Sequence, residues 1–280
     1  MKPDLSRTEA LLGVDAVERL RFSHVAVVGV GGVGSWCAEA LVRTGVGAMT
    51  LIDDDLVAPS NVNRQCPATA ATLGQKKVEA MRERLLAINP SGKVEAIPAR
   101  YPDGLPADFS LKGFDCVVDA IDSVDCKAAL ILAATEAGVP LVSSMGAALR
   151  LDPTKVVVRR FDKVEGDGLA RALRQRFKRL GRYPAAPFRC VCSTESPRQL
   201  PPDDGRQVKG SVMPVTCAFG MALAAEAVSH LQGYGDFRQV PDAYFDAGRI
   251  GRREPRLLNG APPLDGAEEK AYNTHMSPTR

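Results

Sequence analysis

Two hydrophobic patterns alternate along the first half of the chain. Residues 24–29 form a continuous apolar run, which is typical of a strand buried on both faces of a parallel sheet. The sequence also predicts strands at residues 48–53, 93–98, 114–119 and 140–144. Between the runs, residues 35–44, 78–88 and 124–137 carry apolar side chains at helical spacing. This alternation predicts an α/β fold with a doubly wound, mostly parallel, Rossmann-like sheet and helices on both faces.

The pattern differs at both ends of this core. Residues 8–21 predict a helix in an N-terminal arm that spans residues 1–22. After residue 146, residues 155–161 predict a strand of a C-terminal antiparallel extension, and a basic helix follows within an insertion at residues 162–215. Residues 183–214 predict a long loop, and residues 216–231 a helix. We expect one main domain over residues 23–258 and a disordered tail over residues 259–280.

Composition narrows the class of protein. The sequence is 45% hydrophobic and 25% charged, which is ordinary for a globular protein with a sizeable core. We predict a cytoplasmic protein without a membrane contact, because the apolar runs are short and the N-terminus has no secretory pattern. The seven cysteines are odd in number and irregularly spaced, which argues against a disulfide framework. No Cys-x-x-Cys pair occurs, so the sequence does not support a four-cysteine zinc site.

A glycine-rich turn, Gly29-Val-Gly-Gly-Val-Gly34, follows the first predicted strand. A strand, such a turn and a helix start together direct backbone N–H groups toward a phosphate. Gly29 allows the tight turn, Gly31 the approach of the anion, and Gly34 close packing of helix on strand, with Gly32 between them. Asp53 ends the second strand and can accept hydrogen bonds from ribose hydroxyls. NAD, FAD and ATP sites share these features.

Three charged residues favour ATP cleavage over dinucleotide binding. Arg64 and Lys77 can neutralise charge that builds up on the α-phosphate and on departing pyrophosphate. Asp122 follows a buried strand and can hold Mg²⁺. Each residue alone has an ordinary explanation, as a surface cation or a helix N-cap. Their joint spacing predicts nucleotidyl transfer with ATP and Mg²⁺ as cofactors.

These motifs resemble the ubiquitin-activating-enzyme superfamily over roughly residues 6–233. The resemblance implies that the glycines contact phosphate and that Asp53 binds the ribose, with Asp55 nearby. It assigns the triphosphate, the leaving phosphates and the magnesium to a further set: Asn61, Arg64, Gln65, Lys77 and Asp122. It also implies that Arg7 reaches the site of a second subunit, and therefore that the protein is a homodimer.

Further segments resemble one branch of the superfamily, the tRNA threonylcarbamoyladenosine dehydratases. They are residues 31–39, 119–124, 127–130, 151–154 and 190–195. This resemblance implies ATP-dependent cyclisation of threonylcarbamoyladenosine in tRNA through an acyl-adenylate on the threonyl carboxylate. The alternative is adenylation of the C-terminal carboxylate of a ubiquitin-like sulfur-carrier protein, and a cysteine-desulfurase or sulfur-acceptor system is a candidate partner. The absence of Cys-x-x-Cys zinc motifs favours tRNA over a carrier protein as the substrate. Arg64, Lys77 and Asp122 argue against a non-catalytic nucleotide sensor.

Two cysteines are candidates for a covalent step: Cys190, to which the sequence assigns no role, and Cys217. Cys217 lies at the start of the helix predicted over residues 216–231, where the helix dipole would lower the pKa of its thiol. Burial as a small hydrophobic residue is the favoured alternative, because ring closure within the substrate requires no protein nucleophile.

The predicted basic helix carries six cations and no acid over residues 168–182. An apolar stripe accounts for one face, and the cations flank it. A solvated surface face is the ordinary interpretation, whereas the unopposed charge favours a polyanion. We predict tRNA contacts from five of these residues: Arg171, Arg174, Lys178, Arg179 and Arg182. Charge reversal at Arg174 and Lys178 is then expected to weaken tRNA binding.

Overall fold

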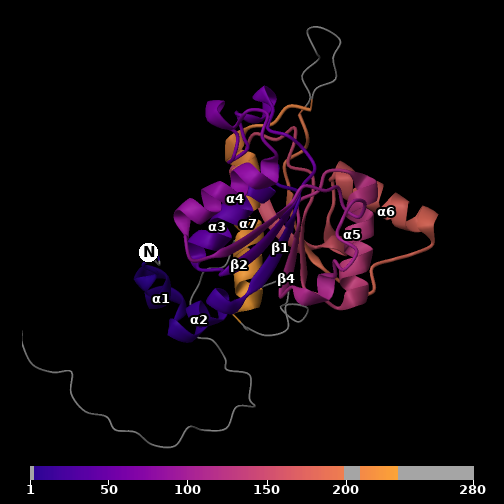
Figure 1. Ribbon diagram of the computed structural model, residues 1–280. Helices are drawn as coiled ribbons and strands as arrows, with labels where there is room; N and C mark the ends of the chain where they lie inside the picture. The colour runs from indigo at the N-terminus through magenta and orange to yellow at the C-terminus, as the bar shows by residue number, and fades with distance from the viewer. Residues whose placement is uncertain (1–2, 199–208, 233–280) are drawn as a thin grey trace, which may run out of the picture. The chain divides into compact units, whose positions relative to one another are not determined.

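The computed structural model describes residues 3–198 and 209–232, and these residues contain one seven-stranded sheet (Figure 1). The strand order is β3-β2-β1-β4-β5-β7-β6. The strands are β1 His24–Val28, β2 Ala48–Ile52, β3 Lys93–Ile97, β4 Cys116–Asp119, β5 Leu141–Ser144, β6 Val156–Arg160 and β7 Arg189–Ser193. Every neighbouring pair is parallel except β6 and β7. The predicted fold class, with its antiparallel extension, is therefore confirmed.

Helices cover both faces of this sheet (Figure 1). They are α1 Ser6–Leu12, α2 Val14–Phe22, α3 Gly34–Thr44, α4 Lys77–Ile88, α5 Val124–Ala137, α6 Gly168–Leu180 and α7 Met213–Leu231. Five short 3-10 helices lie between them: η1 Pro59–Asn61, η2 Ala70–Thr72, η3 Leu111–Gly113, η4 Pro153–Lys155 and η5 Phe161–Lys163. Helices α3, α4 and α7 lie on one face, and α5 and α6 lie on the other.

Two apolar cores result from the period of two along each strand. In β1, Val25 and Val27 belong to the core under α3, α4 and α7. Ala26 and Val28 belong to the core under α5 and α6. Successive side chains of a strand point to opposite faces, so a continuous apolar run fills both cores. This is why the strand positions were readable from the sequence.

Helix α7 packs tightly against α3. A Cβ placed on Gly220 would stand 2.6 Å from the Val33 carbonyl oxygen and 2.8 Å from the Trp36 Cβ, so only glycine allows this approach. Among the described helices, α7 is the one long and apolar enough to cross a membrane by composition. Phe219 and Leu223 are fully buried in the protein core, which accounts for its apolar character.

Two predicted elements differ from the structure. The helix predicted over residues 8–21 is two helices, because Gly13 between α1 and α2 has a φ of 86° that interrupts the helical backbone. The single long loop predicted over residues 183–214 is wrong at β7, which pairs with β5 and β6 inside the sheet. Prolines before the strand and polar residues after it made this stretch resemble a loop in the sequence.

Helix α6 starts at a buried cap. The Asp167 side chain accepts a hydrogen bond from the Ala170 N–H at 2.9 Å, and also from the Gly146 N–H at 3.1 Å. Arg150 forms an ion pair with the same carboxylate at 3.3 Å, and both side chains are almost fully buried. These contacts tie the start of α6 to the loop that follows β5. The tail predicted over residues 259–280 lies outside the described residues.

Candidate active site

The predicted site residues lie together in the loops at the carboxyl ends of the parallel strands. The glycine turn follows β1, Asp53 follows β2, and Asp122 follows β4. Because β1 lies between β2 and β4, these three loops are neighbours. Ligands of open α/β sheets bind at this end of the strands. The tertiary structure therefore joins residues that the chain separates.

The glycine turn has the close packing that the sequence predicted. Gly29 has a φ of 92°, and a Cβ on it would stand 2.7 Å from the Ala120 carbonyl oxygen. A Cβ on Gly34 would stand 1.9 Å from the Gly29 carbonyl oxygen. The nearest atom to a Cβ on Gly31 is the Gln65 Nε2, at 3.9 Å. Side-chain atoms at Gly29 and Gly34 would collide with the fold, whereas Gly31 faces space that an anion can enter.

Asp53 is held by two backbone amides. Its Oδ2 accepts from the Val30 N–H at 2.7 Å, and its Oδ1 accepts from the Asp55 N–H at 2.9 Å. Burial raises the pKa of this carboxyl, and Lys77 and the two amide hydrogen bonds oppose that rise. The side chain is thus fixed beside the glycine turn, where a nucleotide ribose would lie.

Lys77 begins α4 and points its ammonium group at Asp55. The Lys77 Nζ lies 2.6 Å from the Asp55 Oδ2, with the lysine side chain 6% exposed and the aspartate side chain 66% exposed. The carboxylate oxygens of Asp53, Asp54 and Asp55 lie within 4.8 Å of one another. Backbone amides and Lys77 account for two of these three acids, so the cluster does not in itself indicate a metal site.

Arg64 lies against the glycine turn. Its Cγ and Cδ would stand 3.2 and 3.3 Å from a Cβ on Gly32, so the aliphatic stem crosses directly over that glycine. The guanidinium donates to the Ser60 carbonyl oxygen and to the Asn63 Oδ1, each at 2.9 Å. Gly32 therefore has a second use that the motif did not predict. It makes room for the aliphatic stem of Arg64 beside the glycine turn.

Two neighbouring amide side chains have different surroundings. Asn61 is buried, and its Oδ1 accepts from the Ala58 N–H at 3.0 Å, which closes the η1 turn. Gln65 is also buried, and in the described part of the chain its Oε1 has no hydrogen-bond partner. Gln65 is consequently free to bond a ligand, whereas the Asn61 oxygen is used within its own loop.

The loop that carries Asp122 is fastened by a buried ion pair. The Lys127 Nζ lies 2.9 Å from the Asp119 Oδ2, and both side chains are fully buried. Lys127 also donates to the Ile121 carbonyl oxygen at 3.1 Å, and Ser143 donates to Asp119 at 2.7 Å. Asp122 itself is exposed, and no described side chain bonds or pairs with its carboxylate. The roles of Asp119 and Lys127 were not predicted from the sequence.

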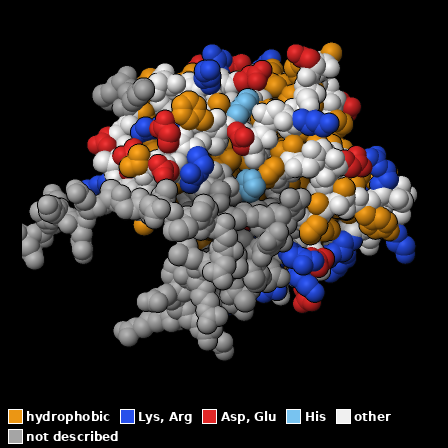
Figure 2. Space-filling model, turned by 90° about the horizontal axis from the view of Figure 1, so that it is seen from below, with side chains coloured by type: hydrophobic (Ala, Val, Ile, Leu, Met, Phe, Trp, Pro, Cys, Tyr) orange, Lys and Arg blue, Asp and Glu red, His pale blue; other side chains and the backbone are white. Residues whose placement is uncertain are grey.

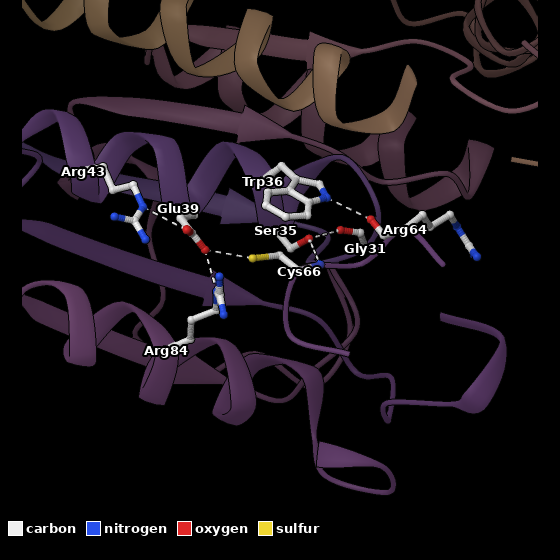
Figure 3. Close-up of polar contacts among 8 residues, drawn as sticks. All are labelled: Gly31, Ser35, Trp36, Glu39, Arg43, Arg64, Cys66 and Arg84. Atoms are coloured by element: carbon white, nitrogen blue, oxygen red, sulfur yellow. Dashed lines mark hydrogen bonds and ion pairs between the residues drawn. The ribbon is translucent and has the colours of Figure 1, made fainter. Parts of the chain in front are cut away.

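A second polar network reaches from the glycine turn to α4 (Figure 3). It runs through α3 and the segment after Arg64, and its members are Gly31, Ser35, Trp36, Glu39, Arg43, Arg64, Cys66 and Arg84. In the sequence, residues 31–39 stood out only as a family motif. Nothing local marked Cys66 or Arg84, because their partners lie far away along the chain.

Cys217 differs from its prediction. Helix α7 starts at Met213, so Cys217 is the fifth residue of the helix and lies beyond its first turn. Burial raises the pKa of its thiol, and the negative charge of Glu39 raises it further. The expected lowering of this pKa is therefore wrong. The neighbouring Thr216 Cβ would stand 3.4 Å from a Cβ on Gly32, which places the start of α7 beside the glycine turn.

The cations of α6 fall into two groups. Arg174 donates to the Phe161 and Val164 carbonyl oxygens at 2.7 and 2.6 Å, and its guanidinium lies 5.0 Å from the centre of the Phe161 ring. Arg176 and Arg182 pair with acids of α5. The sequence alone had suggested unopposed charge, which is wrong for these three residues.

The other cations of α6 have no partner among the described residues. They are Arg171, Lys178 and Arg179, and all three are exposed. Figure 2 shows Lys and Arg side chains gathered on the side of the molecule that carries α6. Arg7, in α1, is likewise exposed and without a described partner.

A doubly wound sheet with a glycine turn and an acid after β2, with Arg64 and Lys77 nearby, defines a nucleotide-binding protein of the Rossmann type. The chain belongs to the ThiF family, which it matches over residues 5–257. It is 34% identical to the tRNA threonylcarbamoyladenosine dehydratase of Bacillus subtilis over 86% of this chain and all of that protein. The resemblance drawn from the motifs is confirmed.

Two further relatives bear on the function. Solved structures of the Escherichia coli tRNA threonylcarbamoyladenosine dehydratase with AMP and with ATP match at 36% identity and cover 82% of this chain. Their TM-scores are 0.72 and 0.69, over 94% and 93% of the solved chains. The E. coli molybdopterin-synthase adenylyltransferase is 32% identical over 87% of both chains.

Proposed function

We propose that this protein uses ATP to cyclise threonylcarbamoyladenosine in tRNA through an acyl-adenylate on the threonyl carboxylate. The observation that carries the proposal is the Arg64 stem lying across Gly32, which holds this arginine beside the glycine turn. A dinucleotide-binding oxidoreductase has no need of a cation there. Similarity to the B. subtilis and E. coli dehydratases supports the choice of substrate.

In the first step, a carboxylate oxygen of the threonyl group attacks the α-phosphorus of ATP, and pyrophosphate departs. The backbone N–H groups of the glycine turn bind the triphosphate. Arg64 and Lys77 stabilise the charge that collects on the transferred and departing phosphates. Asp53 holds the ribose. The Lys77 ammonium group is paired with the exposed Asp55 before ATP binds. When ATP binds, Lys77 leaves Asp55 and contacts the phosphates.

In the second step, the carbamoyl group of the same substrate attacks the activated carbonyl carbon. A ring closes, AMP leaves with one former carboxylate oxygen, and the carbamoyl group gives up a proton. The net loss from the nucleoside is one water. Because both reacting groups belong to one molecule, the step has an intramolecular advantage and needs no protein nucleophile. Cys217, whose thiol pKa is raised, is not required.

Mg²⁺ fits the site at Asp122. This carboxylate is exposed and unpaired within the described residues, whereas Asp53 and Asp55 are already engaged. A bound Mg²⁺ would neutralise phosphate charge. Lys127 and Asp119 hold the Asp122 loop in place. We expect Asp122→Asn to raise the Mg²⁺ concentration needed for half-maximal activity, and Asp108→Asn, an exposed acid elsewhere, to leave it unchanged.

A homodimer completes the proposal. Arg7 is exposed on α1, and we propose that it reaches the nucleotide of a second subunit. Three large apolar side chains of the same arm are exposed in the single chain, namely Leu11, Val14 and Phe22. Apolar surface of this kind favours association. Arg171, Lys178 and Arg179 would bind tRNA phosphates, and a cytoplasmic location agrees with such a substrate.

The alternative is adenylation of a sulfur-carrier protein at its C-terminal carboxylate, with a sulfur-acceptor system as partner. The similarity to the molybdopterin-synthase adenylyltransferase favours it. The nucleotide site serves both reactions, so they differ only in the molecule whose carboxylate is adenylated. The absence of any Cys-x-x-Cys pair from this sequence supports tRNA.

Mass spectrometry of the nucleosides tests the function. The protein is incubated with threonylcarbamoyl-modified tRNA, ATP and Mg²⁺, and the tRNA is then digested. A modified nucleoside lighter by one water, with AMP formed in equal amount, is the expected result. An unchanged nucleoside, with AMP formed only after a carrier protein is added, supports the alternative instead.

A further inference from the structure

Three consecutive residues lie across the glycine turn. The Arg64 stem covers Gly32, and the Gln65 amide approaches Gly31. Cys66 follows them and is buried, with 7% exposure. The segment of residues 64–66 therefore packs directly against the glycine turn.

Helix α3 fastens this segment at its backbone (Figure 3). Trp36 donates from Nε1 to the Arg64 carbonyl oxygen at 2.9 Å. The Ser35 hydroxyl donates to the Gly31 carbonyl oxygen at 2.6 Å and accepts from the Cys66 N–H at 3.1 Å. Ser35 thus joins the glycine turn to the segment through a single oxygen atom. Arg64 is held on both sides, through its own carbonyl and through the residue two positions later.

The Cys66 side chain makes the third attachment. Its thiol donates to the Glu39 Oε2 at 2.9 Å. Glu39 is in turn held by Arg43 at 2.9 Å and by Arg84 of α4 at 2.5 Å. Ser35 and Glu39 are four residues apart and so lie on the same face of α3. One face of α3 therefore forms hydrogen bonds with both the backbone and the side chain of Cys66.

This thiol is suited to donating a hydrogen bond and unsuited to nucleophilic attack. Burial raises the pKa of Cys66 to about 12, and the hydrogen bond to Glu39 contributes to the rise. The thiol therefore keeps its proton at neutral pH. A protonated thiol beside a carboxylate has only the role of donor.

We propose that Cys66 is a positioning residue, which holds the Arg64 backbone and stem against the glycine turn through its thiol bond to Glu39 and its amide bond to Ser35. The role rests on the proposed function, in which Arg64 acts on the triphosphate. Cys66 itself touches no reacting atom.

Three variants test this role. Cys66→Ala removes the thiol donor and keeps the backbone N–H. Cys66→Ser restores a donor to Glu39. Cys37→Ala is the matched control, because Cys37 is a fully buried cysteine of α3 with no polar partner among the described residues. Like Cys66→Ala, this substitution removes one buried sulfur atom, but it leaves the hydrogen bonds of Ser35, Glu39 and Cys66 unchanged.

Trp36 supplies the readout, because it is the only tryptophan of the chain and its ring bonds Arg64. Its fluorescence follows the segment directly, and titration with ATP gives the dissociation constant without any tRNA. We expect Cys66→Ala to shift the Trp36 emission and to lower AMP formation by about tenfold or more, since small displacements of positioned groups cost this much. Cys66→Ser restores both. Cys37→Ala lowers the melting temperature and changes neither.

A double variant separates positioning from general damage. In an Arg64→Ala background, Cys66→Ala should reduce ATP binding no further, because its effect passes through Arg64. Additive losses, or a Cys66→Ala protein with unaltered Trp36 emission and ATP binding, would overturn the proposal. A wild-type protein that binds ATP but leaves the tRNA nucleoside unchanged contradicts the proposed function alone. One that binds no ATP contradicts both.

Discussion

Lys77 and Asp55 lie 22 positions apart in the sequence, yet their side chains form an ion pair of 2.6 Å at the edge of the nucleotide site. The lysine is buried and the aspartate is largely exposed. An ion pair with an exposed partner contributes little to stability. The pair therefore keeps the Lys77 ammonium group beside the glycine turn, and breaking it to contact a phosphate costs little free energy.

Replacement of Lys77 should therefore affect catalysis more than folding. We expect Lys77→Met to lower the rate of AMP formation by about 10²–10³-fold, because a charge-stabilising donor is lost from the transition state. Asp55→Asn should have a smaller effect. Lys76→Met is the control, since Lys76 is the adjacent, exposed lysine. Equal losses for Lys76→Met and Lys77→Met would contradict the assignment.

The two glycines Gly31 and Gly34 of the turn should respond differently to alanine. Gly34→Ala places a Cβ 1.9 Å from the Gly29 carbonyl oxygen, so we expect a clear fall in melting temperature. Among the described residues, a Cβ on Gly31 meets no atom closer than 3.9 Å, so Gly31→Ala should leave the melting temperature unchanged. It should weaken ATP binding, because the new methyl group occupies the space of the phosphate. Calorimetry and an ATP titration measure the two effects; normal ATP binding by Gly31→Ala would place the phosphate elsewhere.

Glu39 should make stability depend on acid pH. Burial alone would raise the pKa of its carboxyl, but hydrogen bonds from Arg84, Cys66 and Arg43 outweigh burial and lower it from 4.5 to about 2. The stabilisation is complete above pH 4.5 and is lost as the pH falls toward 2. The difference in unfolding free energy between wild type and Glu39→Gln should thus shrink over this interval. Glu79→Gln, at a half-exposed pair, should give a small and constant difference.

Lys127 should be essential for folding because its charge is fully buried with that of Asp119. Lys127→Met leaves the Asp119 carboxylate without its partner, which we expect to cost about 3–5 kcal/mol of unfolding free energy. Adding Asp119→Asn should recover part of this loss. The exposed pair of Arg160 and Asp162 is the comparison, and Arg160→Met should cost less than about 1 kcal/mol. Chemical denaturation measures all four proteins.

The free cations of α6 should carry tRNA affinity. Lys178→Glu with Arg179→Glu should weaken binding and lower the slope of log K against log salt by about 0.7–0.9 for each phosphate that the protein no longer neutralises. Lys93→Glu, on strand β3 at the far edge of the sheet, is the control. Arg174→Ala should act mainly on stability, because it removes hydrogen bonds to two carbonyl groups. Unchanged tRNA binding by the double variant would remove α6 from the interface.

Much of this protein was readable from local patterns. The apolar run at β1 and the glycines after it predicted a buried parallel strand and a phosphate turn, since both depend on backbone geometry that neighbouring residues set. The start of α7 was placed three residues too late, because Pro214 was assigned to the preceding loop although it lies in the first turn of the helix. β7 was missed because the prolines before it and the polar residues after it are typical of a loop.

The sequence by itself determined the alternation of strands and helices in the parallel part of the sheet, the glycine turn and the charged residues that chemistry requires. Only the tertiary structure decided which of those charges are free. It engages Arg174 with carbonyl groups and leaves Lys178 exposed, although both stood as equal cations in one helix. It also places Cys66 against Glu39. Such pairings depend on how distant segments pack, and a linear pattern carries no record of the distance between them.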